Sequence, residues 1–181
     1  MRERCGENGI CESSINLSIT KKVQTLLEQS GCTVLLTRED ENGIYDSNAN
    51  TIREKKVSDL KNRAKLANES NADVFISIHL NKFDSPQYWG WQTFFRKNDE
   101  KSKKLAICIQ DGLNHMIQKE NKRQALTIDN KYLVEHVSIP IVICECGFLS
   151  NPEEAKLLQE DSYQEKLAFG IYTGILEYFL K

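Results

Sequence analysis

The stretch DVFISIH, from Asp73 to His79, decides the fold, because it is a short and almost continuously apolar run that ends in a polar residue. Its counterpart is IVICE, from Ile141 to Glu145. Runs of this kind are typical of strands that are buried on both faces of a parallel sheet, and here they alternate with helical patterns. We therefore predict an α/β fold, a three-layer αβα sandwich around a mostly parallel sheet.

Further helices and strands are predicted on either side of these two runs. Apolar residues recur at helical spacing, and short β-branched runs and capping residues mark the other boundaries. The predicted helices cover residues 14–30, 57–67, 99–117 and 163–178, and one more begins at Asn151-Pro152; the other predicted strands cover 33–37, 92–96 and 132–134, with loops at 38–51 and 119–130. Ser162 and Glu165 predict a capping box for the last helix.

The composition limits the classes of protein to which the chain can belong. The 181 residues fit one domain, and 24 Lys and Arg against 26 Asp and Glu give a net charge of −2, so we expect no nucleic-acid partner. The apolar stretches are far below the roughly 20 residues that span a bilayer, and the segment Met1–Gly6 has no apolar signal core, so the chain is expected to be soluble and untargeted. The six cysteines are predicted to be buried free thiols.

Polar residues at the ends of the two apolar strands are the candidates for chemistry. In open α/β sheets, ligands bind beyond the carboxyl ends of the strands, where His79 and Glu145 would meet. Glu12 lies just before the first helix. A zinc hydrolase needs about three protein ligands and a carboxylate base; Glu12 and His79 supply two ligands and Glu145 the base. From the residues alone, Glu12 could also be a helix cap or a solvated charge, His79 a core histidine and Glu145 an ion-pair partner.

Several motifs together resemble the zinc-dependent N-acetylmuramoyl-L-alanine amidase family, and they span nearly the whole chain in the family's order. They are Glu12-Ser-Ser-Ile-Asn16-Leu17, Leu36-Thr37-Arg38, Arg63 with Ala67-Asn68, Ser77-Ile-His79-Leu-Asn81 and Glu145-Cys-Gly147-Phe148-Leu149-Ser150-Asn151. The segment after Arg38, the stretch from Gly90 to Phe94 and the helix start at Asn151 are most similar to the spore-cortex branch of that family.

The resemblance implies a peptidoglycan hydrolase that cuts the amide between N-acetylmuramic acid and L-alanine, with Zn²⁺ as cofactor. It implies that Glu12 and His79 are zinc ligands and Glu145 the general base, while Asn16, Arg63, Asn81 and Asn151 shape the site. The substrate implies an extracytoplasmic location, in the cell wall or the intermembrane space of a developing spore. In the cortex branch, the cut prepares the formation of muramic-δ-lactam by a second enzyme.

The chain departs from the family at its start. The family opens with a strand and an Asp-Pro-Gly-His-Gly-Gly motif that carries a further zinc ligand, whereas no histidine precedes His79 here. We therefore expect residues 1–181 to form a single amidase catalytic domain that is amino-terminally shortened and lacks the family's first strand. The unpaired sheet edge would invite a strand-swapped homo-oligomer or an activating protein partner. His115 and His136 are not expected to replace the missing ligand.

Two other functions remain open on the sequence. One is a catalytically silent domain that binds peptidoglycan or a partner with an incomplete zinc site. The other is a different zinc peptidase, such as a carboxypeptidase, which is disfavoured because neither HExxH nor HxxE occurs.

Overall fold

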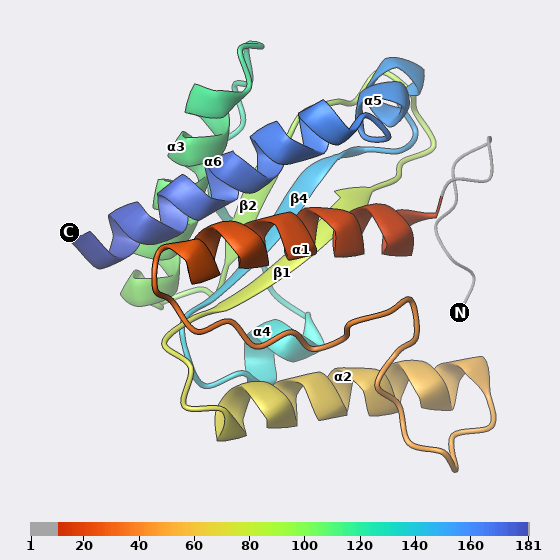
Figure 1. Cartoon of the computed structure of the whole chain (residues 1–181). Coiled ribbons are helices and arrows are strands. Elements are labelled where there is room, and N and C mark those ends of the chain that lie inside the picture. The colour runs from red at the N-terminus through yellow and green to blue at the C-terminus, as the bar shows by residue number, and fades with distance from the viewer. Residues whose placement is uncertain (1–10, 181) are drawn as a thin grey trace.

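The computed structural model describes residues 11–180, in which helices and strands alternate along the chain (Figure 1). The helices are α1 (Glu12–Gln29), α2 (Ile52–Glu69), α3 (Glu100–Met116), α4 (Tyr132–His136), α5 (Pro152–Leu157) and α6 (Asp161–Leu180), and the strands are β1 (Phe75–Asn81), β2 (Gln92–Phe95), β3 (Leu126–Thr127) and β4 (Ile141–Phe148).

The four strands form one mixed sheet in the order β1-β4-β2-β3. The pairs β1–β4 and β2–β3 are parallel, and β2–β4 is antiparallel, so the sheet is less uniformly parallel than predicted. The reason lies in residues 82–91, which join β1 to β2 without a helix. A parallel crossover needs a dozen or more residues, so this short connection returns β2 in the opposite direction.

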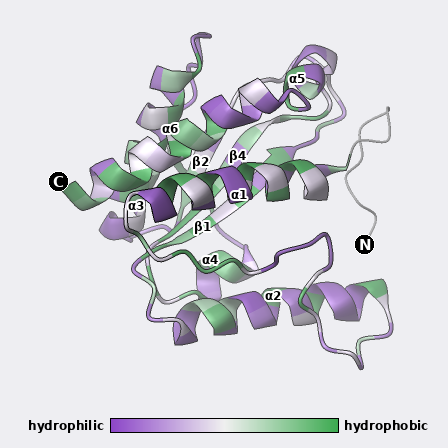
Figure 2. Ribbon diagram, in the orientation of Figure 1, coloured by the Kyte–Doolittle hydropathy of each residue, from purple (hydrophilic) through white to green (hydrophobic). Residues whose placement is uncertain are grey.

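Helices cover both faces of the sheet, which confirms the predicted sandwich. One face packs with α1, α3 and α6 around the larger apolar core, which includes Val142, Cys144 and Cys146 from β4. The alternate residues of β4, Ile141 and Ile143, face the smaller core under α2 and α4. Helix α2 is largely hydrophilic in Figure 2, and alanines make most of its buried contribution to that core.

Glycines let α3 and α6 approach closely. A Cβ placed on Gly112 of α3 would lie 2.2 Å from the carbonyl oxygen of Gly170 in α6, and one on Gly174 would lie 2.4 Å from the Cα of Ile109. Neither distance is possible for a real side chain, so these glycines set how closely the two helices pack.

Several predicted elements need correction. The segment 33–37 has the composition of a strand, but no segment of the described chain forms a ladder with it. Residues 132–134 begin the short helix α4, in which Tyr132 stacks on His136 at a centroid distance of 3.9 Å; three apolar residues are too few to distinguish the two periodicities. The predicted loop 119–130 contains β3. Helix α6 begins at Asp161, which places Ser162 inside its first turn rather than at a cap.

The cysteines are of three kinds. Cys108, Cys144 and Cys146 are buried and free, as predicted, whereas Cys32 is free but exposed. Cys11 is disulfide-bonded, which contradicts its prediction as a free thiol; Cys5 lies outside the described residues.

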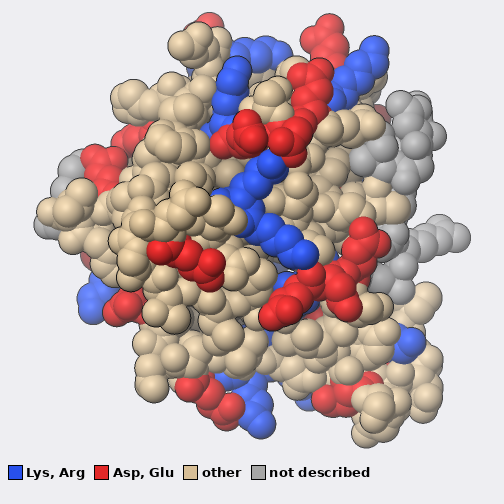
Figure 3. All heavy atoms as spheres, in the orientation of Figure 1, with Lys and Arg blue, Asp and Glu red and all other residues tan. Residues whose placement is uncertain are grey.

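One face of the molecule shows charges of both signs. In the view of Figure 3, basic and acidic residues are interspersed over the same face. Within residues 11–180, no helix is both long enough and apolar enough to cross a membrane. The predicted shortening at the amino terminus concerns a part of the chain that lies outside the described residues.

Candidate active site

The first turn of α1 brings Glu12 to the carboxyl end of β1. Its Oε1 atom lies 3.1 Å from Nδ1 of His79 and accepts a hydrogen bond of 3.2 Å from the backbone N–H of Leu80. One turn along the helix, the buried Asn16 donates Nδ2–H to the same oxygen at 3.2 Å. The structure therefore brings together the two residues predicted as zinc ligands, although they are 67 positions apart in the sequence.

A contact at the second ring nitrogen also orients the His79 ring. Nε2 lies 3.0 Å from Oγ of Ser77, two residues earlier on the same face of β1. The side chain of His79 is 43% exposed while that of Glu12 is 14% exposed. Contacts within the protein therefore orient the Glu12–His79 pair, and solvent can reach it at His79.

Glu145 lies beside this pair on the next strand. It is the Cα partner of His79 in the parallel ladder and of Gln92 in the antiparallel ladder. Paired residues project to the same side of a sheet, so His79, Glu145 and Gln92 form a row across β1, β4 and β2, which we call the polar row. Ile143 and Phe94 project to the same side but lie under α2 and α4, so the polar row begins where these helices stop.

The Glu12–His79 pair fits part of a zinc site. Ligand atoms bound tetrahedrally at about 2.0–2.1 Å from zinc lie roughly 3.3 Å from each other, close to the 3.1 Å between Glu12 Oε1 and His79 Nδ1. Catalytic zinc takes three protein ligands, and residues 11–180 contain no group of three or more His, Cys, Asp and Glu side chains that could hold a metal. Two donors therefore fit, and the described residues place no third His, Cys, Asp or Glu side chain with them.

The other residues implied by the resemblance shape the surroundings. Arg63 forms an ion pair with Asp59 at 2.8 Å in α2 and also donates to Thr37, which ties the loop after α1 to α2. Asn81 accepts the N–H of Leu149 on its carbonyl at 2.8 Å. Asn151 caps α5 and donates Nδ2–H to the carbonyl of Pro86.

Glu154 is a buried residue close to the site whose structural role sequence reasoning missed. It is only 3% exposed, and its carboxylate accepts hydrogen bonds from the backbone N–H groups of Phe148 at 2.8 Å and Gly90 at 2.9 Å. Burial raises the pKa of its carboxyl above the usual 4.5, against these hydrogen bonds and the nearby Lys119 and Arg123. Glu154 thus joins the segment just after Glu145 to the turn before β2. The acidic helix start that contains it predicted only a cap.

The two other histidines and the two tryptophans differ in their burial and in their contacts. His115 and His136 are exposed, and their Nδ1 atoms contact backbone carbonyls of their own helices, those of Asp111 and Tyr132 respectively. Trp91 is fully buried in the core, and its Nε1–H donates to Asn114. Trp89 is half-buried and lines a surface pocket.

The structure thus places a histidine and two carboxylates together at the carboxyl edge of an αβα sandwich, side-chain types that hydrolases use to hold a metal and to act as a base. The profile of the N-acetylmuramoyl-L-alanine amidase family matches residues 3–177. The chain therefore belongs to this family of peptidoglycan amidases.

Known proteins agree with this assignment. The germination-specific N-acetylmuramoyl-L-alanine amidase of Bacillus subtilis is 37% identical over 170 residues, which cover 94% of this chain and 71% of that protein. The CwlD amidase of Clostridioides difficile, solved in complex with the GerS lipoprotein, is 44% identical with a TM-score of 0.95 and covers 98% of this chain and 91% of its own. The catalytic domain of the amidase CwlV from Paenibacillus polymyxa is 28% identical, with a TM-score of 0.80 over 96% and 88% of the two chains.

Proposed function

We propose that this chain hydrolyses the amide between N-acetylmuramic acid and L-alanine with zinc held by Glu12 and His79 and with Glu145 as general base. The observation that carries the proposal is the 3.1 Å approach of Glu12 Oε1 to His79 Nδ1, with Glu145 beside His79 in the β1–β4 ladder. The alternative of a silent binding domain does not explain why these three residues converge.

Each residue has a distinct task in this reaction. Bound zinc would polarise the amide carbonyl and lower the pKa of a water molecule. The N–H groups of Leu80 and Asn16 hold the Glu12 carboxylate, and Ser77 holds the His79 ring, so both ligands are oriented before a substrate arrives. Glu145 would take a proton from the attacking water and give it to the leaving nitrogen, so that L-alanine leaves as an amine rather than as an anion and the water oxygen remains in the new carboxyl group of the muramic acid lactyl group.

Spore cortex is the proposed substrate, and the proposed location is extracytoplasmic, in the cell wall or the intermembrane space of the developing spore. The basis is the 37% identity to a germination-specific amidase. The disulfide at Cys11 supports such a location, because disulfides persist in oxidising compartments outside the cytoplasm.

A protein partner is also proposed. The C. difficile amidase that is 44% identical was solved with a lipoprotein bound. We expect this chain to bind an extracytoplasmic protein that assists its activity. A partner of this kind would leave the turnover of the isolated chain low and raise it in the complex, whereas a strand-swapped homo-oligomer would give a mass of two or more chains without any partner.

The decisive experiment incubates the zinc-loaded protein with purified cortex peptidoglycan and identifies the products by mass spectrometry. We expect stem peptides with a new free L-alanine amine, and glycan strands that carry unsubstituted muramic acid. Glu145→Gln should reduce turnover by about 10²- to 10⁴-fold, because it removes the proton acceptor and keeps the side-chain shape. Its zinc content should match that of the original chain.

The zinc assignment has its own control. His79→Ala should lower the bound zinc measured by elemental analysis, while His115→Ala, which changes an exposed histidine outside the site, should not. Stem peptides that stay attached to muramic acid with zinc and partner present would overturn the amidase proposal. Equal zinc content in the two histidine variants would overturn the ligand assignment.

A further inference from the structure

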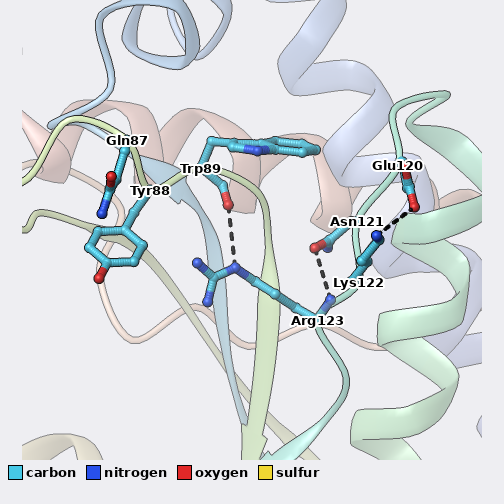
Figure 4. A pocket seen from close by; sticks show the side chains of 7 residues that line it. All are labelled: Gln87, Tyr88, Trp89, Glu120, Asn121, Lys122 and Arg123. Carbon is cyan, nitrogen blue, oxygen red and sulfur yellow. Dashed lines mark hydrogen bonds and ion pairs between the residues drawn. The ribbon is translucent and has the colours of Figure 1, made fainter.

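A basic pocket of about 440 Å³ lies on the surface beside the polar row. Figure 4 shows its lining, with Tyr88 and Trp89 from the turn before β2 on one side and the loop 120–123 on the other. The Arg123 side chain extends from this loop toward the two aromatic residues (Figure 4). Neither the proposed zinc pair nor Glu145 lines this pocket, so it is a separate feature of the surface.

Arg123 is held in place by hydrogen bonds rather than by a direct ion pair, and its nearest named acidic neighbour is the buried Glu154, on whose pKa its charge acts. Its Nε–H donates to the carbonyl of Trp89 at 3.3 Å and its Nη1–H to Oε1 of Gln92 at 3.2 Å, while the guanidinium lies 5.0 Å from the centroid of the Phe148 ring. No ion pair or further side-chain hydrogen bond of Arg123 occurs within residues 11–180. The side chain is therefore fixed while the donors on Nη2 remain available, which suits a planar carboxylate.

The pocket is connected to the catalytic residues through Gln92. This residue is the Cα partner of Glu145 and belongs to the polar row, and its Oε1 accepts from Arg123. One side-chain hydrogen bond therefore links the guanidinium to the residue that pairs with Glu145. Arg123 thus lies one residue beyond the proposed base along the row and is not itself among the residues proposed to act on the scissile amide.

The charge around the pocket favours an anion. Lys122 is exposed and paired with Glu120 at 3.4 Å, so these two charges largely cancel. Lys119 lies 4.0 Å from the centroid of the Trp89 ring and contributes a further positive charge. Glu154, which accepts a hydrogen bond from Gly90 next to Trp89, is buried, and backbone N–H groups donate to its oxygens.

We infer that Arg123 binds a carboxylate of the stem peptide on the leaving side of the scissile amide. The inference rests on the proposed amidase function and adds a recognised group to it. In a stem peptide whose second residue is a γ-linked glutamate, the free α-carboxylate lies roughly 6–7 Å from the scissile bond. A group that binds this carboxylate must therefore lie close to the proposed base, and Arg123 is linked to that base through Gln92. Trp89 and Tyr88 then flank the peptide on the other side of the pocket.

The test compares two soluble muramoyl peptides that differ at one group. Both carry L-alanine followed by a γ-linked glutamate and a further residue; the first keeps the glutamate α-carboxylate and the second has the carboxamide. For the original chain we expect a KM about 10- to 100-fold lower for the carboxylate substrate, since a hydrogen-bonded charge pair of this kind contributes about 1.5–3 kcal/mol. The kcat values should be similar, because Arg123 does not contact the reacting atoms.

Arg123→Ala should remove this preference by raising the KM for the carboxylate substrate and leaving that for the carboxamide nearly unchanged. The comparison is made within one variant, so a general loss of folded protein affects both substrates equally. Lys122→Ala is the matched control from the same loop and should keep the preference. An original chain that treats both substrates alike, or a variant that loses both equally, would overturn the inference.

A failure of the amidase function gives a different result. If the original chain cuts neither substrate, the proposed function fails, and the pocket is then tested by calorimetric titration with the two intact muramoyl peptides. Tighter binding of the carboxylate form that disappears in Arg123→Ala would support the anion pocket on its own. Equal affinities for both forms would refute it.

Discussion

Removing the carboxylate of Glu154 should destabilise the whole domain, because this side chain joins two segments that border the site. Glu154→Ala leaves the buried N–H groups of Phe148 and Gly90 without their acceptor, where they now donate at 2.8 and 2.9 Å. An unsatisfied buried donor costs about 1–3 kcal/mol, so the two together cost about 2–6 kcal/mol. The free energy of unfolding of a domain is about 5–15 kcal/mol, so this loss is a large fraction of the stability.

The assay is urea unfolding followed by circular dichroism, with Glu153→Ala as the matched control. Glu153 lies in the same first turn of α5, is exposed and has no side-chain hydrogen bond within residues 11–180, so its loss removes only a charge near the helix start. That charge contributes about 0.3–1 kcal/mol. Equal unfolding free energies for the two alanine variants would refute the role of Glu154 as a connector.

The pH dependence of stability provides a second test of the same residue. Because burial raises the pKa of Glu154 above 4.5 in the folded chain, the folded state holds this proton more tightly than the unfolded state. Its contribution to stability is fully present below pH 4.5 and is lost as the pH rises through the folded pKa. Glu154→Gln cannot titrate, so the stability difference between the original chain and this variant should change over that window. A constant difference across it would contradict the raised pKa.

Three further predictions concern separate parts of the molecule. Asn16→Ala removes a donor to Glu12 and should weaken zinc binding by about 10- to 100-fold in competition with a chelator, and an unchanged affinity would show that this hydrogen bond does not orient the ligand. Gly112→Ala places a methyl group 2.2 Å from the carbonyl oxygen of Gly170 and should cost about 1–3 kcal/mol or more, measured as a lower melting temperature; an unchanged value would mean that α3 and α6 separate freely. Among the free cysteines of residues 11–180, Cys32 alone should react quickly with a thiol reagent in the folded state, and fast reaction of a second one would contradict the burial of the others.

The sequence predicted the parts of the site that lie on regular strands and at a helix start. The apolar runs that end near His79 and Glu145 identified β1 and β4, and the parallel register then places these two residues side by side. Zinc-site chemistry and the family resemblance suggested that Glu12 joins them, but the local pattern could not show it, because the approach of Glu12 to His79 spans 67 positions. Local periodicity contains no information about such a contact.

The residues that the sequence did not predict depend on tertiary contacts. Glu154 contacts Gly90 across 64 positions, and Arg123 contacts Gln92 across 31 positions. Both were hidden in segments with an ordinary local explanation, a helix start and a polar loop. One signal could have identified Glu154. It is the third residue of the short helix that begins at Pro152, and from there its side chain reaches back to the end of β4.

The antiparallel insertion of β2 has a functional consequence. A parallel strand at this position would need a crossover helix, and its carboxyl end would point to the same edge as those of β1 and β4. Because β2 instead runs back from that edge, its first residue, Gln92, lies opposite Glu145, and the turn with Trp89 lies just beyond. The loop that carries Arg123 then reaches this turn by way of β3, which pairs with β2. The departure from a parallel sheet is therefore what places the basic pocket beside the proposed catalytic base. If this topology positions Arg123 as we infer, the variant Arg123→Ala loses the preference for the peptide carboxylate and keeps its kcat.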